Sequence, residues 1–334
     1  MNIFDHKGLK ERAAARLGEA SYNPRLLVLL HTGISLGAAL LVAIANFILS
    51  EKISATGGLS GIGLRSVLTT AQSFLQLTLT LLTPFWEIGI IYAAIRLIRG
   101  QSAQPGDLTA GFYRFGPVFR LKLLQLVLLS ILAMPCLYVS LGIFSMTPLS
   151  AEFINVMLPI WEEASATGQI AQPDASTIEA LTIATKPLIP IFILVYIGAA
   201  LPLSYRFRLA DYIISDEPPC GAFAAMLTSW KMTRGRGVAL FRLDLSFWWF
   251  YVLQALSAVL AYSDLLLPRL GISLPLPENG AYFLFYGLYI AAELALSWCF
   301  GAQVQTTYAA AYEAFLQPPV LPMQMPFPQE PEQF

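Results

Sequence analysis

Six long apolar segments follow one another along the chain, and polar stretches separate them. They cover about residues 26–49, 68–98, 118–146, 188–214, 243–267 and 282–302, and the last continues as a helical pattern toward Phe315. Each exceeds the roughly 20 residues with which a helix crosses about 30 Å of hydrocarbon. Because a helix satisfies its own backbone hydrogen bonds in lipid, the pattern predicts an all-α polytopic membrane protein with six transmembrane helices.

The composition agrees with this prediction. Of the 334 residues, 56% are hydrophobic and only 12% are charged, whereas soluble domains carry about 25% charged residues. The cysteines are few and far apart, at Cys136, Cys220 and Cys299, and they predict neither a disulfide framework nor a structural zinc site. The only histidines are His6 and His31, so we expect no metal and no cofactor.

The basic residues predict an orientation. Sixteen of the 20 Lys and Arg residues lie before the first segment, or in and beside the connections from the second to the third and from the fourth to the fifth. Basic residues remain on the cytoplasmic side, so both termini are expected inside, N-in/C-in. A count of five or seven spans would instead place the C-terminal tail outside.

The same patterns divide the chain into three parts. Residues 1–24 form a polar amphipathic segment at the cytoplasmic face, and residues 25–316 form the transmembrane domain. Within that domain, residues 147–185 form an outer loop that has acidic residues but no Lys or Arg. Residues 317–334 form a Pro-rich tail that we expect to be disordered.

The connection between the fourth and fifth segments contains an amphipathic helix, expected over residues 218–234. Phe223, Met226, Leu227 and Trp230 fall on one stripe of it. Basic residues follow, and we regard them as candidates for contact with lipid headgroups: Lys231, Arg234, Arg236 and Arg242. Two interpretations fit this pattern equally, an interfacial helix on anionic headgroups and a connecting helix packed under the bundle.

Five letters occur nearly twice, as FRLKL at 119–123 and FRLDL at 241–245. Each copy follows a basic connection with a Pro-containing turn, QPGD at 104–107 and EPPC at 217–220. Two hairpins related by duplication would produce this pattern. Chance, together with the preference for arginine at the inner end of a span, would also produce it.

The second copy lies within SDEPPCGAFAAMLTSWKMTRGRGVALFRLDLSFWW, residues 215–249. This stretch resembles the bacterial multi-pass membrane family catalogued as domain of unknown function 975. The family's pattern, D-x-P followed by S-x-x-L-M-x-G-x-x-x-x-x-F-x-L-x-L-S-F, is matched at Asp216, Pro218, Ser229, Gly235, Phe241, Leu243, Leu245, Ser246 and Phe247. Met232 and Thr233 replace its Leu and Met. The resemblance implies a polytopic protein of the bacterial cell membrane and offers no catalytic residues.

Three ionisable residues within the apolar segments are candidates for a ligand or ion site: Glu87, Glu293 and His31. Glu87 follows Pro84, a proline that would free backbone carbonyls by kinking the helix. His31 would reach Glu87 if the first two spans pack together. The three could form a protonatable relay or a cation site, or they could be polar pairs that fasten helices. At the inner boundary, Asp244 near Arg242 and Asp211 near Arg208 are expected to form local pairs or to contact headgroups.

These features favour a non-enzymatic, transporter-like membrane protein. The alternative is a membrane scaffold or an accessory protein in envelope assembly. A lipid-active enzyme is the third possibility, although the chain has no HExxH, GxSxG or Walker A pattern. The expected partner is the bilayer, with anionic headgroups at the cytoplasmic face, and no nucleic acid is expected.

Overall fold

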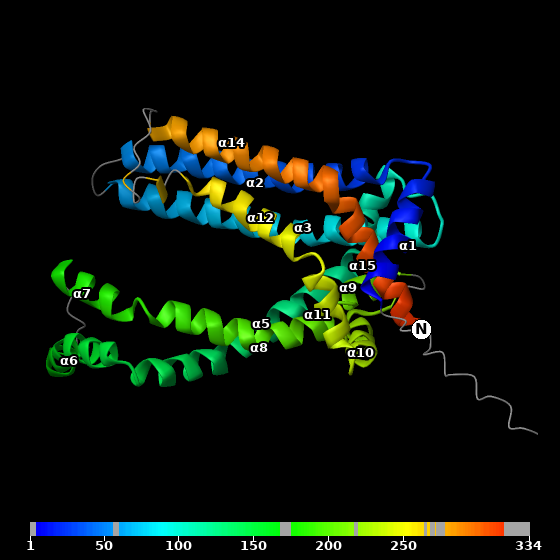
Figure 1. The fold of residues 1–334 in the computed structure, drawn as a ribbon. Coiled ribbons are helices and arrows are strands. Elements are labelled where there is room, and N and C mark those ends of the chain that lie inside the picture. Colours follow the sequence, from blue (N-terminus) through cyan, green and yellow to red (C-terminus); the bar gives the residue numbers. More distant parts are fainter. Residues whose placement is uncertain are drawn as a thin grey trace, which may run out of the picture. The chain divides into compact units, whose positions relative to one another are not determined.

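The computed structural model describes residues 5–55, 60–167, 175–216, 220–263, 266–267, 271 and 278–316. Every regular element in these ranges is a helix, which confirms the predicted helical class. The contacts between residues divide the chain into two units (Figure 1). Unit 1 comprises residues 1–119 and 208–334, and unit 2 comprises residues 120–207. The Pro-rich tail and Pro218 lie outside the described residues.

The described residues of unit 2 form four helices: α5 (Phe115–Ser145, whose first turn belongs to unit 1), α6 (Pro148–Thr167), α7 (Ala175–Thr185) and α8 (Leu188–Phe207). The region expected as an outer loop therefore contains two helices, α6 and α7, which pack on each other. Phe144 at the end of α5 contacts Phe153 of α6, with ring centroids 6.2 Å apart. Large apolar side chains along α5 and α8 are exposed, as lipid-facing helices require.

Unit 1 contains the remaining elements: α1 (His6–Glu19), α2 (Pro24–Ala55), α3 (Ser60–Ile98), η1 (Pro105–Thr109), α4 (Ala110–Tyr113), α9 (Ala210–Ser215), α10 (Ala222–Thr233), α11 (Gly237–Leu245), α12 (Trp248–Ala261), α14 (Glu278–Leu296), η2 (Ser297–Gly301) and α15 (Ala302–Leu316). The long helices α2, α3, α12 and α14 lie side by side (Figure 1). Part of their core is a buried cluster that joins α2, α3, η1 and α15, with Leu27, Ile90, Leu108 and Ala302 among its members.

Within the described residues, five helices are long and apolar enough to cross a membrane, and the number rises to six if the bent pair α11–α12 is one span. The two helices of this pair differ in direction by 61°. The sequence predicted one continuous helix here. The break lies at Ser246, whose hydroxyl donates to the carbonyl of Leu243, and at Phe247, whose N–H donates to Asp244 at 2.9 Å. Each bond reaches the carbonyl three positions earlier, instead of the four of a regular α-helix. The α-helix therefore ends there.

Two glycines allow α3 to approach the segment that follows it. A Cβ atom on Gly89 of α3 would lie 2.1 Å from the carbonyl oxygen of Leu108 in η1. A Cβ atom on Gly111 of α4 would lie 2.1 Å from the carbonyl oxygen of Phe85 in α3. The two backbones therefore touch at two places, and only glycine fits there. This contact fixes η1 and α4 against the inner half of α3.

A candidate polar cavity and its supporting ion pairs

A cavity of about 360 Å³ lies among the helices of unit 1. Residues of α2, α3, α9, α12, η2 and α15 line it, together with Arg208. Its polar lining includes His31, Glu87, Arg208, Asp211, Gln254 and Gln305. The cavity is polar although it lies between segments that are long and apolar enough to span a membrane.

The cavity brings together two of the three candidate site residues. His31 of α2 and Glu87 of α3 both line it, because these two helices pack along each other. The Nε2 atom of His31 is buried and has no hydrogen-bond partner among the described residues. Pro84 lies inside α3, one turn before Glu87.

The third candidate, Glu293 of α14, is not among the described residues that line this cavity. The hydroxyl of Ser257 in α12 donates to its carboxylate, and Ser257 is buried. Glu293 therefore joins α14 to α12, which is the helix-fastening role that the sequence left open.

A short π-helical turn, η2, forms one wall of the cavity. Ser297 at its start receives a hydrogen bond from Thr32 of α2 at 2.9 Å, and both line the cavity. Gly301 at its end lies close to α2, since a Cβ atom there would meet Val28 Cγ1 at 2.7 Å. Such turns interrupt the regular hydrogen bonds of a helix and are frequent at functional sites.

Arg208 is held in place by neighbours in α11 and α15. Its guanidinium forms an ion pair with Asp244, and its Cζ lies 4.5 Å from the centroid of the Tyr308 ring. The Tyr308 hydroxyl donates to the other oxygen of Asp244 and lies 2.7 Å from the hydroxyl of Tyr251. Asp244 was expected to interact locally beside Arg242, whereas its ion pair joins it to an arginine 36 positions away.

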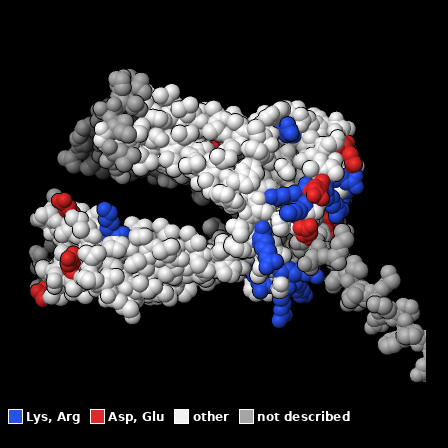
Figure 2. All heavy atoms as spheres, in the orientation of Figure 1, with Lys and Arg blue, Asp and Glu red and all other residues white. Residues whose placement is uncertain are grey.

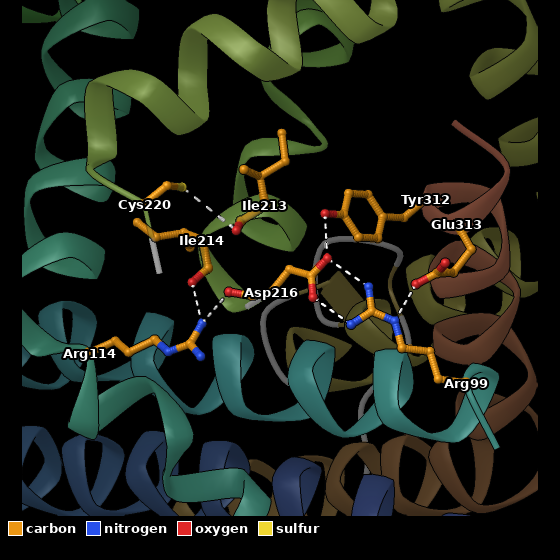
Figure 3. Close-up of polar contacts among 8 residues, drawn as sticks. All are labelled: Arg99, Arg114, Ile213, Ile214, Asp216, Cys220, Tyr312 and Glu313. Atoms are coloured by element: carbon orange, nitrogen blue, oxygen red, sulfur yellow. Dashed lines mark hydrogen bonds and ion pairs between the residues drawn. The ribbon is translucent and has the colours of Figure 1, made fainter. Parts of the chain in front are cut away.

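A second polar cluster, the Asp216 cluster, lies where α3, α9 and α15 end (Figure 3). Arg99 donates to both carboxylate oxygens of Asp216, at 2.6 and 2.7 Å, and its Nε donates to Glu313 at 2.7 Å. Tyr312 donates its hydroxyl to Asp216 at 3.0 Å. The hydrogen bond between Arg99 and Asp216 is the main cause that raises the pKa of the Arg99 guanidinium above its ordinary value.

Two further arginines fix the connection between α3 and α5. One amino group of Arg114 donates to the main-chain carbonyls of Ile214 and Asp216, both at 2.8 Å (Figure 3). Arg96 pairs with Asp107 at 2.7 Å. Asp107 also accepts from the backbone N–H of Gln104. In the sequence these arginines count only among the basic residues that predict the orientation, because their partners lie far away in the chain or across a turn.

The four headgroup candidates have different surroundings. Lys231, Arg234 and Arg242 are exposed, whereas Arg236 is half-buried, with its Cζ 5.7 Å from the centroid of the Phe315 ring. Figure 2 shows that the described Lys and Arg side chains of unit 1 gather at the end of the helices where α1, α10 and α15 lie. The described residues hold no group of three or more His, Cys, Asp or Glu side chains placed to bind a metal ion.

Several positions of the family pattern have structural roles. Asp216 accepts the two hydrogen bonds of Arg99. Gly235 has a φ of +75°, a backbone conformation that side chains other than glycine rarely adopt. Ser246 breaks the α11–α12 pair, and Phe247 is buried. None of these four positions is among the described residues that line the cavity.

Comparisons with known proteins place the chain in a family. Neither the curated proteins nor the solved structures include a match. A family model with the description Protein of unknown function (DUF975) matches residues 4–294. Since this match covers most of the 334 residues, including the whole 215–249 stretch, the chain belongs to the DUF975 family.

Proposed function

We propose that the chain is a six-span protein of the bacterial cell membrane, with both termini in the cytoplasm, and that it transports a small positively charged solute. The cavity that contains His31 and Glu87 is the proposed binding site. This cavity is the single observation that carries the proposal, because a polar, ionisable pocket inside a membrane is costly unless it serves a function. The distribution of Lys and Arg supports the orientation.

The charges around the cavity favour a cation. Two carboxylates, Glu87 and Asp211, line it. Arg208, the one arginine among the described lining residues, is already paired with Asp244. When His31 is neutral, the lining therefore has an excess of negative charge. This charge attracts a cation and repels an anion.

Protonation of His31 and Glu87 gives a means of coupling solute movement to protons. A proton that enters this pair changes the cavity's charge by one unit, and that change weakens the binding of a cation. The other titratable or charged groups that face the cavity are Arg208, Asp211 and Tyr212 near α9, Tyr251 on α12 and Tyr308 on α15. We assign the coupling to His31 and Glu87 because they lie on two different spans, α2 and α3.

The test uses purified protein in liposomes, with choline, ethanolamine and spermidine as cationic probes and glucose and acetate as controls. We expect at least one cationic probe to accumulate when a proton gradient is imposed. Glu87→Gln abolishes that uptake, because it removes both the charge and the proton site. Glu293→Gln is the matched control, since it makes the same change outside the cavity, and we expect it to retain uptake.

A scaffold is the second candidate function. The Ser257–Glu293 hydrogen bond and the Asp216 cluster favour it, because both fasten helices without forming a binding site. If no cationic probe moves, and if Glu87→Gln and Glu293→Gln both restore a strain that lacks the protein, transport is excluded and the scaffold remains.

A further inference from the structure

The helix α10 directs its bulky apolar side chains away from the protein. Its buried positions are mostly small, at Ala222, Ala225, Ser229 and Thr233, and Met226 is buried as well. Phe223 is 72% exposed, Leu227 44% and Trp230 41%. A connecting helix packed under a bundle would bury its large apolar residues and expose its small ones. The observed arrangement is the reverse.

The exposed apolar residues lie on one side of each helix. Phe223, Leu227 and Trp230 follow at i, i+4 and i+7, so they lie on one side of α10. The short α11 has the same kind of stripe, with Val238, Phe241 and Leu245 exposed at i, i+3 and i+7. Trp248, at the start of α12, is also exposed. Between the two helices, Gly235 turns the chain at a φ of +75°.

Exposed cations accompany this apolar face. Lys231 follows Trp230 directly and Arg234 lies four positions after Trp230, while Arg242 follows Phe241 on α11. Asp244 is the single acidic residue between positions 220 and 245, and its ion pair is with Arg208. The exposed charge of this face is therefore positive.

We propose that the α10–α11 face, defined by Phe223, Leu227, Trp230, Lys231, Arg234, Val238, Phe241 and Arg242, binds anionic lipid at the membrane surface. Charge complementarity assigns the headgroup, because lysine and arginine near a membrane attract anionic lipids. Continuity with the membrane assigns the location, because α11 and α12 together are long and apolar enough to cross a membrane. A helix with apolar side chains and adjacent bases on its outer face lies in the interface plane. This inference does not depend on the cavity or on transport.

The experiment measures which lipid touches α10 in the full-length protein. A fluorophore is attached at Leu227→Cys, in a background where Cys136, Cys220 and Cys299 are alanine, and the protein is placed in phosphatidylcholine nanodiscs with added phosphatidylglycerol. Spin-labelled lipid of either kind then quenches the fluorophore on contact. A fluorophore at Glu11→Cys, an exposed position of α1, is the site control.

We expect lipid to quench the label at 227 more strongly than the label at 11, and spin-labelled phosphatidylglycerol to quench it more than phosphatidylcholine. The double variant Lys231→Gln with Arg234→Gln lowers the preference for phosphatidylglycerol over phosphatidylcholine. The expected decrease is about five-fold for each base removed, as for cations near a charged surface. Lys7→Gln with Arg12→Gln, which also removes one lysine and one arginine from exposed positions, leaves the preference unchanged.

Results of three kinds would overturn the proposal. The first is a label at 227 that water-soluble acrylamide quenches and lipid does not. The second is equal quenching by the two lipids, or an equal loss of preference in the two double variants. The third is quenching of the label by a spin label on a second copy of the chain, which would make the face a protein interface. Monodisperse behaviour of each variant in detergent is required before its quenching is compared.

Discussion

Lys10 of α1 donates a hydrogen bond to the main-chain carbonyl of Ser246, 236 positions later in the chain, at 2.8 Å. The same ammonium group lies 3.9 Å from the centroid of the Phe247 ring. Both contacts fall at the break between α11 and α12, where the helix ends and leaves carbonyls without their usual partners. The N-terminal helix thus satisfies a backbone group that the bend between α11 and α12 exposes. Desolvation by burial lowers the pKa of Lys10.

The first prediction concerns this contact. Lys10→Met keeps the length of the side chain but removes its donor and its charge, so the carbonyl of Ser246 loses its partner. We expect the free energy of unfolding to fall by about 1–3 kcal/mol. The measurement is unfolding by SDS in mixed micelles. Lys7→Met, at an exposed position of the same helix, serves as the control and should change stability little. Equal losses in the two variants would refute a specific role for Lys10.

The second prediction concerns the Asp216 cluster. Asp216→Asn removes the negative charge that accepts hydrogen bonds from two nitrogens of Arg99. Among the described residues, Glu313 then remains as the acidic partner of Arg99. Since the side chain of Asp216 is only 14% exposed, we expect a loss of about 1–3 kcal/mol, as for hydrogen bonds to charged groups. Glu19→Gln breaks the exposed pair with Arg16 and should cost at most about 1 kcal/mol. The same SDS titration ranks the two, and a reversed order would contradict the prediction.

The third prediction concerns the glycines between α3 and its connection. Gly89→Ala and Gly111→Ala each place a methyl group against a backbone carbonyl, which cannot move away as a side chain can. We expect each to destabilise unit 1 by about 1–3 kcal/mol or more. Gly37→Ala, inside α2 with no atom within 4 Å of its Cβ position, should instead stabilise its helix by up to about 1 kcal/mol. Thermal unfolding of the three variants checks this difference in sign.

The fourth prediction concerns pH. Burial raises the pKa of the Cys220 thiol above its ordinary value, and this outweighs the backbone hydrogen bond and the neighbouring Arg114, which lower it. The thiolate therefore forms only at higher pH, so alkylation should begin later as the pH rises. The rate of alkylation by iodoacetamide is measured against pH in a variant where Cys136 and Cys299 are alanine. The control is a cysteine placed at exposed Gln101, in a variant where Cys220 is alanine as well. The pH at which the rate reaches half its maximum should be higher for Cys220 than for the control. Identical midpoints would show that Cys220 is not shielded.

Particular residues show how far the family pattern could be understood from the sequence. Gly235 could be assigned to a turn, because glycine in a polar stretch is typical of one. Asp216 could not be assigned a partner, because Arg99 lies 117 positions before it. Ser246 occurs in a continuous apolar segment, so nothing in the hydropathy pattern separates α11 from α12. The 61° break depends on local hydrogen bonds and on the cation from α1.

The sequence by itself determined the helical class, the family, and the helices apolar enough to cross a membrane, because hydrophobic length and local pattern are properties of consecutive residues. It also identified His31 and Glu87 as ionisable groups within apolar segments. Only the tertiary structure decided that these two line one cavity, that Glu293 faces Ser257, and that Asp244 pairs with Arg208. Those outcomes depend on which helix faces are in contact, and packing between distant segments sets those faces.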